Sequence, residues 1–172
     1  PCPVRTPCTA CKPELETSHC DQVVVSEEDR VEGPWTRDGL VQAQKADSQL
    51  GPVYRALEES PVQPSPRDIM LWSRESKILW NQWVRLSLRE GVLCRKWEEP
   101  DGLRVSWQVV VPTEFRRELF QRAHGGMTGG HLGLEKTEAQ LVRRMYWPTW
   151  RSDAKLWIQQ CVPCVRYHRG AP

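Results

Sequence analysis

The sequence HGGMTGGH at residues 124–131, followed by CVPC at residues 161–164, decides the fold of the C-terminal third of this chain. Histidine nitrogen and cysteine thiolate are the donors that hold structural zinc, and four protein ligands close such a site. Two thiolates also offset the charge of the ion. The spacing therefore predicts one structural zinc ion, held by His124, His131, Cys161 and Cys164.

The segments around these ligands predict three short helices. The first opens near Thr113, has Phe115, Leu119 and Ala123 along one side, and ends at His124; the glycines that follow let the chain turn back to His131. A second helix is expected from Leu134 to about Met145. A third follows Thr149 and places on a single face Trp150, Ala154, Trp157, Ile158 and Cys161. We expect a zinc-stabilised three-helix bundle with helix-turn-helix character over 113–169, since so small a core needs the metal.

Two other interpretations of the four ligands are weaker. A surface histidine pair with an inert cysteine pair leaves the joint spacing and the glycine-rich loop unexplained. A redox C-x-x-C motif is expected beside a βαβ pattern, and none surrounds Cys161.

Residues 35–112 predict helical segments followed by a β-hairpin. A helix in two pieces runs from Asp38 to about Leu57, interrupted at Gly51-Pro52. An amphipathic helix runs from Ser76 to Arg89, with Leu79, Trp83 and Leu86 on one stripe. Apolar residues then alternate over 92–97 and 105–111, on both sides of a Pro-Asp-Gly turn. The expected buried face of the second strand holds Val105, Trp107, Val109 and Val111. The fold class is mainly α with a small β-hairpin, α+β.

Residues 1–34 are rich in proline and carry an acidic run, so we expect an irregular, disordered segment. A second zinc site is conceivable there because Cys8 and Cys11 have ligand spacing, but the adjacent His19 and Cys20 make poor joint ligands. Disorder is favoured for this segment, which holds Cys2, Cys8, Cys11, His19 and Cys20. Near the other end, His168 is expected in a solvated basic tail, since Cys164 already completes the ligand set.

Charge is unevenly distributed along the chain. Residues 113–172 hold ten Lys and Arg against five Asp and Glu, a net of +5, whereas residues 1–112 hold fourteen against seventeen, a net of −3. A basic third suits a polyanionic partner. Candidate phosphate contacts are Lys136, Arg143, Arg144, Arg151 and Lys155, although a solvated helix face explains them equally well.

The termini and hydropathy bear on the location of the chain. No apolar stretch approaches the length of a membrane span, and the N-terminus has no secretory signal and no initiator methionine. We expect an intracellular chain that is a fragment or processed piece of a longer protein.

Beyond the four ligands, the sequence HLGLEKT at residues 131–137 and YWP at residues 146–148 closely resembles the H2C2 zinc-binding domain of Ty3/gypsy-type retrotransposon integrases. The resemblance is strong over 113–169. Upstream, Trp35, Gln44 and Asp47, with the segments 91–93 and 109–112, look like the region that precedes this finger in gypsy polyproteins. It thus covers roughly 35–172.

The resemblance implies a zinc-binding module that assists integrase multimerisation and binds element-end DNA in the nucleus. It also implies that the bundle is packed by Leu132, Leu134, Leu141, Tyr146 and Trp147. The strand-transfer chemistry of the family needs a ribonuclease-H-like core of about 100 residues with three carboxylates. Only eight residues follow Cys164, so we expect no catalytic residue, no small-molecule substrate and no enzyme activity in this chain.

Two alternatives stay open at this level. One is a domesticated host module that binds a protein partner and no DNA. The other is that the chain is one piece of a longer, active integrase.

Overall fold

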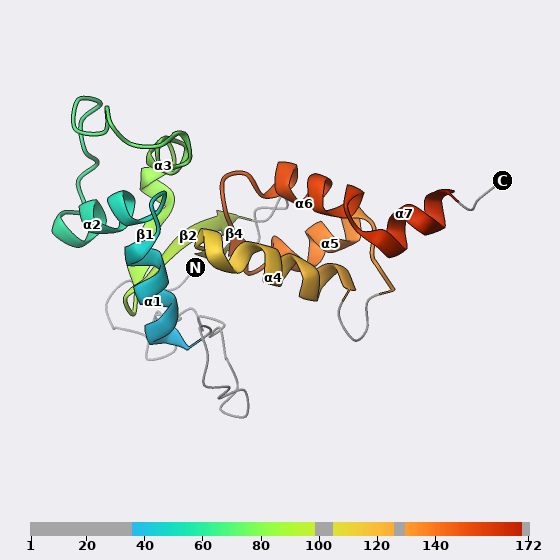
Figure 1. Ribbon diagram of the computed structural model, residues 1–172. Coiled ribbons are helices and arrows are strands. Elements are labelled where there is room, and N and C mark those ends of the chain that lie inside the picture. Colours follow the sequence, from blue (N-terminus) through green and yellow to red (C-terminus); the bar gives the residue numbers. More distant parts are fainter. Residues whose placement is uncertain (1–35, 99–104, 126–129, 170–172) are drawn as a thin grey trace, which may run out of the picture.

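The computed structural model describes residues 36–98, 105–125 and 130–169 of the chain (Figure 1). Helices α1 to α3 lie at one end, a small sheet lies in the middle, and α4 to α7 form the other end. This is the α+β class that the sequence predicts. The elements are α1 Arg37–Ala46, α2 Gly51–Glu59, α3 Arg74–Trp80, β1 Leu86–Arg89, β2 Val92–Glu98, β3 Val105–Val110, α4 Thr113–Gly125, α5 Leu134–Leu141, β4 Met145–Tyr146, α6 Trp150–Gln159 and α7 Val162–Arg169.

The first predicted helix does fall into two pieces, α1 and α2. The break lies earlier than expected, because α1 ends at Ala46 and Gly51 begins α2. Pro52 then sits in the first turn of α2, where its missing N–H costs nothing. A Cβ at Gly51 would lie 2.7 Å from the carbonyl oxygen of Lys45, so glycine is required for this close approach.

The predicted helix from Ser76 to Arg89 is wrong over its second half. α3 ends at Trp80, a 3-10 turn covers Trp83–Arg85, and Leu86–Arg89 is strand β1. Glu90 and Gly91 have φ values of 48° and 82°, as a tight two-residue hairpin turn between β1 and β2 requires. The apolar stripe was nevertheless identified correctly, since the buried residues are Leu79, Trp83 and Leu86.

The sheet contains more than the predicted hairpin. Its order is β1-β2-β3-β4, with antiparallel pairs except for β4, which pairs parallel to β3 through Val109 with Met145 and Val110 with Tyr146. Met145 was expected at the end of a helix from Leu134, but α5 ends at Leu141 and the chain extends. Strand β4 thus ties the C-terminal helices to the sheet, and it lies in the connection between α5 and α6.

The predicted buried face of the second hairpin strand is wrong within β3, although Val111, which follows the strand, is buried as predicted. Gln108 and Val110 are buried, whereas Val105 is 53% exposed. The amide of Gln108 can be buried because it accepts a hydrogen bond from Arg95 and donates one to the carbonyl of Val142. A satisfied polar side chain therefore occupies a position that the alternation of apolar residues assigns to solvent.

Two apolar clusters form the interior. The first packs α1 against α4, α5 and α6 and contains Ala43, Val111, Phe115, Leu119, Phe120, Leu141, Trp147 and Ala154. The second lies between α2, α3 and the sheet and contains Leu50, Val53, Tyr54, Leu79, Trp83, Leu86, Leu93 and Val110. Leu134, Ala123, Trp150, Trp157 and Ile158 pack against the first cluster as expected, whereas Tyr146 packs against the second.

Some predictions lie outside the described residues. These are the irregular segment 1–34 with its cysteines and His19, the Pro-Asp-Gly turn, and the side chain of His168. Within the described part of the chain, no helix has the length and apolar character that a membrane crossing requires.

Candidate metal centre

The four predicted ligands converge at the end of the molecule formed by α4 and α7. His124 lies in the last turn of α4, His131 follows the glycine-rich loop, Cys161 lies between α6 and α7, and Cys164 is in α7. Their ligand atoms all lie within 4.8 Å of one another. Among residues 36–98, 105–125 and 130–169, this is the group of His, Cys, Asp and Glu side chains that can hold a metal ion.

The separations match a tetrahedral zinc site. With Zn–N near 2.05 Å and Zn–S near 2.3 Å, tetrahedral geometry places two nitrogens about 3.3 Å apart and a nitrogen and a sulfur about 3.6 Å apart. His124 Nε2 lies 3.4 Å from His131 Nδ1 and 3.3 Å from Cys164 Sγ, and Cys161 Sγ lies 3.2 Å from His131 Nδ1. The donor set and its spacing therefore fit one zinc ion.

Hydrogen bonds around His124 orient its ring for coordination. Nδ1 donates to the carbonyl of Leu132 over 2.7 Å, and the N–H of Leu132 donates back to the carbonyl of His124 over 3.0 Å. With its proton on Nδ1, the ring presents the lone pair of Nε2 to the other three donors. Phe120 stacks on the same ring, with centroids 5.2 Å apart, and keeps water from that face.

Thr137 supports the ligand His124 indirectly, and no role was predicted for it from the sequence. Its side chain is fully buried, and its hydroxyl lies 3.0 Å from the carbonyls of Leu132 and Gly133. The carbonyl that fixes His124 is thereby held in place itself. The signal for it was present, since Thr137 ends the HLGLEKT motif.

His131 reaches the centre through an unusual backbone conformation. Its φ is 48°, in the left-handed region that few residues other than glycine adopt, although histidine does so more often than most. Its Nδ1 faces the other donors, so the two histidines present different ring nitrogens. Backbone strain at a residue whose side chain meets three other donors is typical of a functional position.

The cysteine pair is held by a helix that the sequence analysis did not predict. Cys161 follows the end of α6, and its carbonyl accepts the N–H of Val165 within the first turn of α7. Pro163 falls in that first turn, where proline is well tolerated. Cys161, which was expected on the face of the third predicted helix, thus lies after that helix, and the chain then starts another helix, which carries Cys164.

The centre is half buried. His124 is 3% exposed and Cys164 is 8% exposed, whereas His131 is exposed. Burial raises the pKa of the Cys164 thiol, and its hydrogen bond with Cys161 and the charge of that neighbour raise it further. Coordination by thiolate therefore releases protons when the ion binds.

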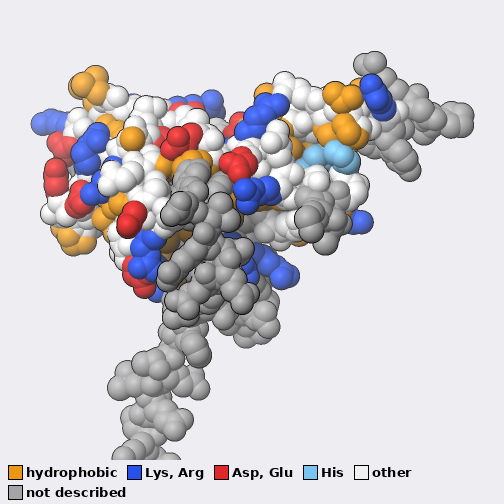
Figure 2. Space-filling view, turned by 60° about the horizontal axis from the view of Figure 1, so that its bottom comes forward, with side chains coloured by type: hydrophobic (Ala, Val, Ile, Leu, Met, Phe, Trp, Pro, Cys, Tyr) orange, Lys and Arg blue, Asp and Glu red, His pale blue; other side chains and the backbone are white. Residues whose placement is uncertain are grey.

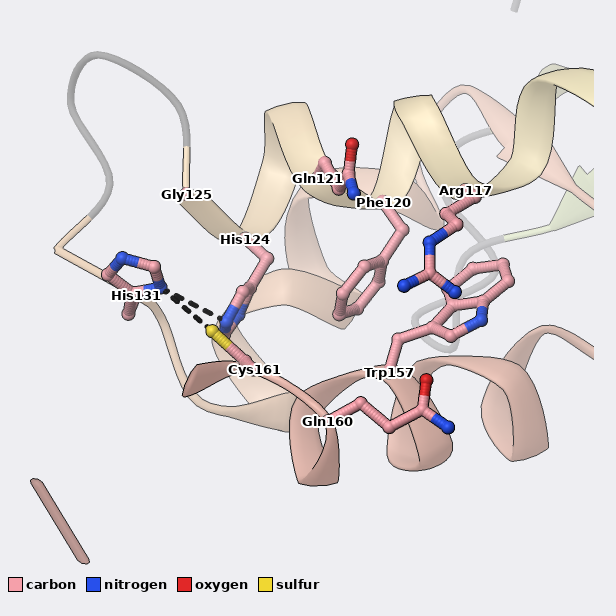
Figure 3. Close-up of a pocket in the computed structure, with 9 residues that line it drawn as sticks. All are labelled: Arg117, Phe120, Gln121, His124, Gly125, His131, Trp157, Gln160 and Cys161. Atoms are coloured by element: carbon pink, nitrogen blue, oxygen red, sulfur yellow. Dashed lines mark hydrogen bonds between the residues drawn. The ribbon is translucent and has the colours of Figure 1, made fainter. Parts of the chain in front are cut away.

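A shallow groove of about 260 Å³ runs beside the centre (Figure 3). Figure 3 shows His124, His131 and Cys161 pointing toward one another at one end, with Phe120, Trp157 and Arg117 further along. Phe120 and Trp157 are in aromatic contact, with centroids 5.1 Å apart. The zinc ligands thus lie directly beside the aromatic residues that pack the bundle.

The five predicted phosphate contacts are all exposed, and none of them lines the groove beside the metal centre. Lys136 is on α5, Arg143 and Arg144 are in the turn before β4, and Arg151 and Lys155 are on α6. Arg151 is paired with Glu138 across 3.0 Å. Figure 2 shows acidic and basic side chains mixed at the end near α1 to α3, and histidine at the surface toward α7.

Comparison with known families agrees with this geometry. Residues 111–169 match the family described as the integrase zinc binding domain, and all four ligands fall inside the matched range. No match to a curated protein was found.

Proposed function

We propose that this chain is a zinc-dependent binding and assembly module of a Ty3/gypsy-type integrase, or of a host gene derived from one; the match of residues 111–169 to the integrase zinc binding domain supports this. The observation that carries the proposal is the convergence of His124, His131, Cys161 and Cys164 within 4.8 Å. In this proposal the module binds element-end DNA and other integrase subunits in the nucleus.

The role of the four ligands is structural. A zinc ion held by these four residues would cross-link the elements that carry them and would supply no bond-breaking chemistry, because protein would fill all four ligand positions. His124 anchors the end of α4, His131 anchors the glycine-rich loop, and the cysteines anchor the junction of α6 and α7. The proposal includes no catalytic role for any residue of this chain.

The proposed DNA contacts are supported by charge. The net of +5 over 113–172 and the exposure of Lys136, Arg143, Arg144 and Lys155 favour a polyanionic partner. Arg151 contributes less to the free charge, since Glu138 pairs with it. Affinity for DNA is then expected to fall steeply as salt concentration rises.

The test combines metal content with DNA binding of the full chain. Purified protein should contain one zinc per chain, and Cys164→Ser should lower both zinc content and DNA affinity. Cys94→Ser is the matched control, because Cys94 is a buried cysteine of β2 outside the donor set. A well-folded wild-type chain without zinc, or DNA affinity that does not change with salt, would reject the proposal.

A second candidate is a module that binds a protein partner and no DNA. It is favoured by apolar side chains that lie open to solvent around α3, namely Val62, Met70, Leu71 and Val84, which are 73%, 71%, 94% and 89% exposed. The same salt titration separates the two candidates, because a module that binds only a protein partner should show no affinity for DNA even at low salt.

A further inference from the structure

A second pocket, of about 240 Å³, lies where the sheet meets the C-terminal helices, apart from the metal centre. We call it the junction pocket; its walls include Arg95, Trp97, Glu138, Tyr146, Trp150 and Arg151. These residues come from β2, α5, β4 and α6, so the pocket exists only in the complete fold. It is smaller than the clefts that hold drug-sized ligands, so it accommodates a small group or one part of a larger ligand.

Arg95 is the unusual residue of the junction pocket. It is 7% exposed, and among the described residues no carboxylate lies within ion-pair distance of it. Its hydrogen bonds go to neutral amides: Nε donates to Gln82 over 2.6 Å, and Nη1 donates to Gln108 over 2.7 Å. A buried cation without a counter-ion is costly, which is a physical reason to expect an anion at this place.

The position of Arg95 is fixed in advance. Gln82 also donates to Ile78 and to the hydroxyl of Tyr146, and Gln108 also donates to Val142, so both amides that hold the guanidinium are themselves anchored. Nη2 makes no hydrogen bond to any described residue. The arginine therefore offers an unused donor without needing to reorganise.

Aromatic rings surround this cation. The Arg95 guanidinium lies 4.2 Å from the ring centre of Tyr146 and 5.3 Å from that of Trp97, and Trp150 forms a further wall. Among the described residues that line the pocket, the cations are Arg95 and Arg151 and the carboxylate is Glu138, which is already paired with Arg151 over 3.0 Å, so this lining has a net positive charge. An occupant of matching chemistry has a flat aromatic part and a negative group.

We propose that the junction pocket binds one unpaired nucleotide of a nucleic-acid strand, with the base against Trp150 and the phosphate at Arg95. This rests on the proposed DNA-binding function and adds the kind of DNA that is preferred. The exposed Arg143 and Arg144 follow Val142 of the pocket wall, so cations continue beyond the pocket for neighbouring phosphates. An acidic peptide would satisfy Arg95 but would bring no flat ring to the aromatic walls, where the guanidinium of Arg151 already lies 5.3 Å from the ring centre of Trp150. Single-stranded nucleic acid supplies both groups, since its bases are free to stack.

The experiment compares the affinity of the full chain for a blunt duplex and for the same duplex with a short single-stranded overhang. The overhang should bind more tightly and quench tryptophan fluorescence. Trp150→Leu should weaken overhang binding by about 5- to 100-fold, as removal of a stacking platform does, so that the ratio of overhang affinity to blunt-duplex affinity falls toward one. Trp150→Phe should keep part of the preference, and Arg95→Gln should lose it.

Trp107→Leu is the matched control, because Trp107 is a partly buried tryptophan of β3 that stacks with Arg89 at 4.6 Å outside the junction pocket. Equal affinity for blunt and overhanging DNA would overturn the pocket proposal and leave the proposed function intact. Equal loss in Trp107→Leu and Trp150→Leu would overturn it too. Absence of all DNA binding would reject both proposals, and quenching by an acidic peptide instead of DNA would assign the pocket to a protein partner.

Discussion

Gln44 is fully buried, yet its side-chain amide meets three backbone groups of the sheet. Nε2 donates to the carbonyls of Leu93 and Val110, over 3.1 and 2.7 Å, and Oε1 accepts the N–H of Leu93 over 2.8 Å. One side chain of α1 thus completes hydrogen bonds that β2 and β3 do not make with each other. Its position explains why an amide, and not an apolar residue, occupies this buried place on the helix.

Gln44→Leu should destabilise the protein by at least about 2 kcal/mol, since it leaves several buried backbone groups unsatisfied at about 1–3 kcal/mol each. Urea unfolding of the two proteins measures the difference. Gln49→Leu is the control, because the buried Oε1 of Gln49 has no hydrogen-bond partner among the residues that the structure describes, and its removal should cost little. Similar losses in both variants would contradict this account of Gln44.

At the scale of elements, Asp47 joins three helices. Its carboxylate accepts the N–H groups of Gln49 and Leu50 at the start of α2, over 2.7 and 3.0 Å, and the N–H of Thr113 at the start of α4, over 2.6 Å. It lies directly after α1. A negative charge is well placed at helix N-termini, so the same residue sets the α1–α2 turn and positions the helix that ends at His124.

The pKa of Asp47 makes this junction sensitive to acid. Burial alone would raise that pKa, but the hydrogen bonds from Thr113, Gln49 and Leu50 outweigh it, so the pKa lies below its ordinary 3.8. A carboxyl whose folded pKa is lowered contributes stability that is complete above its unfolded pKa and is lost as pH falls through the folded one.

Asp47→Asn should therefore lower the free energy of unfolding by about 1–2 kcal/mol at neutral pH, as the loss of a charged cap does. The gap between variant and wild type should close as the pH falls below the ordinary pKa. Unfolding curves over that acid range measure it, and release of metal affects both proteins alike. A gap that stays constant in acid would show that the charge of Asp47 contributes nothing.

At the scale of the whole molecule, the two apolar clusters depend differently on the metal centre. The buried members of the cluster around α2 and α3 all come from Leu50 to Val110, upstream of every ligand. The cluster around α4 to α6 contains Phe120, which stacks on the ligand His124. Loss of the ion therefore removes a direct support from one cluster only.

Removal of zinc by a chelator should speed amide hydrogen exchange in α4 to α7 and leave the protection of β1, β2 and α2 largely unchanged. Exchange measured by mass spectrometry, before and after chelation, separates the two parts, and added zinc should restore the protection. The β3–β4 pair marks the boundary where the effect should fade. Equal loss of protection in both parts would show that the molecule unfolds as a single unit.

The sequence by itself determined the metal centre: the ligand types, their spacing and the glycines between them are local features, and zinc chemistry admits few donor sets. The apolar stripes of α4 and α6 were predicted for the same reason, since helical periodicity depends only on the order of residues within one segment. Leu79, Trp83 and Leu86 show the limit of this information, because they are buried as the stripe requires although the chain around Leu86 is a strand.

Only the tertiary structure decided which buried positions are polar and where segments pair. Gln44 and Gln108 are buried because partners 13 to 66 residues away complete their hydrogen bonds, and no pattern within one segment of the sequence predicts such distant partners. Strand β4 forms because Met145 and Tyr146 pair with the edge of β3 that β2 does not occupy. The physical reason is the same throughout: a polar group or a strand edge is stable in the interior only when a distant part of the chain supplies its hydrogen bonds.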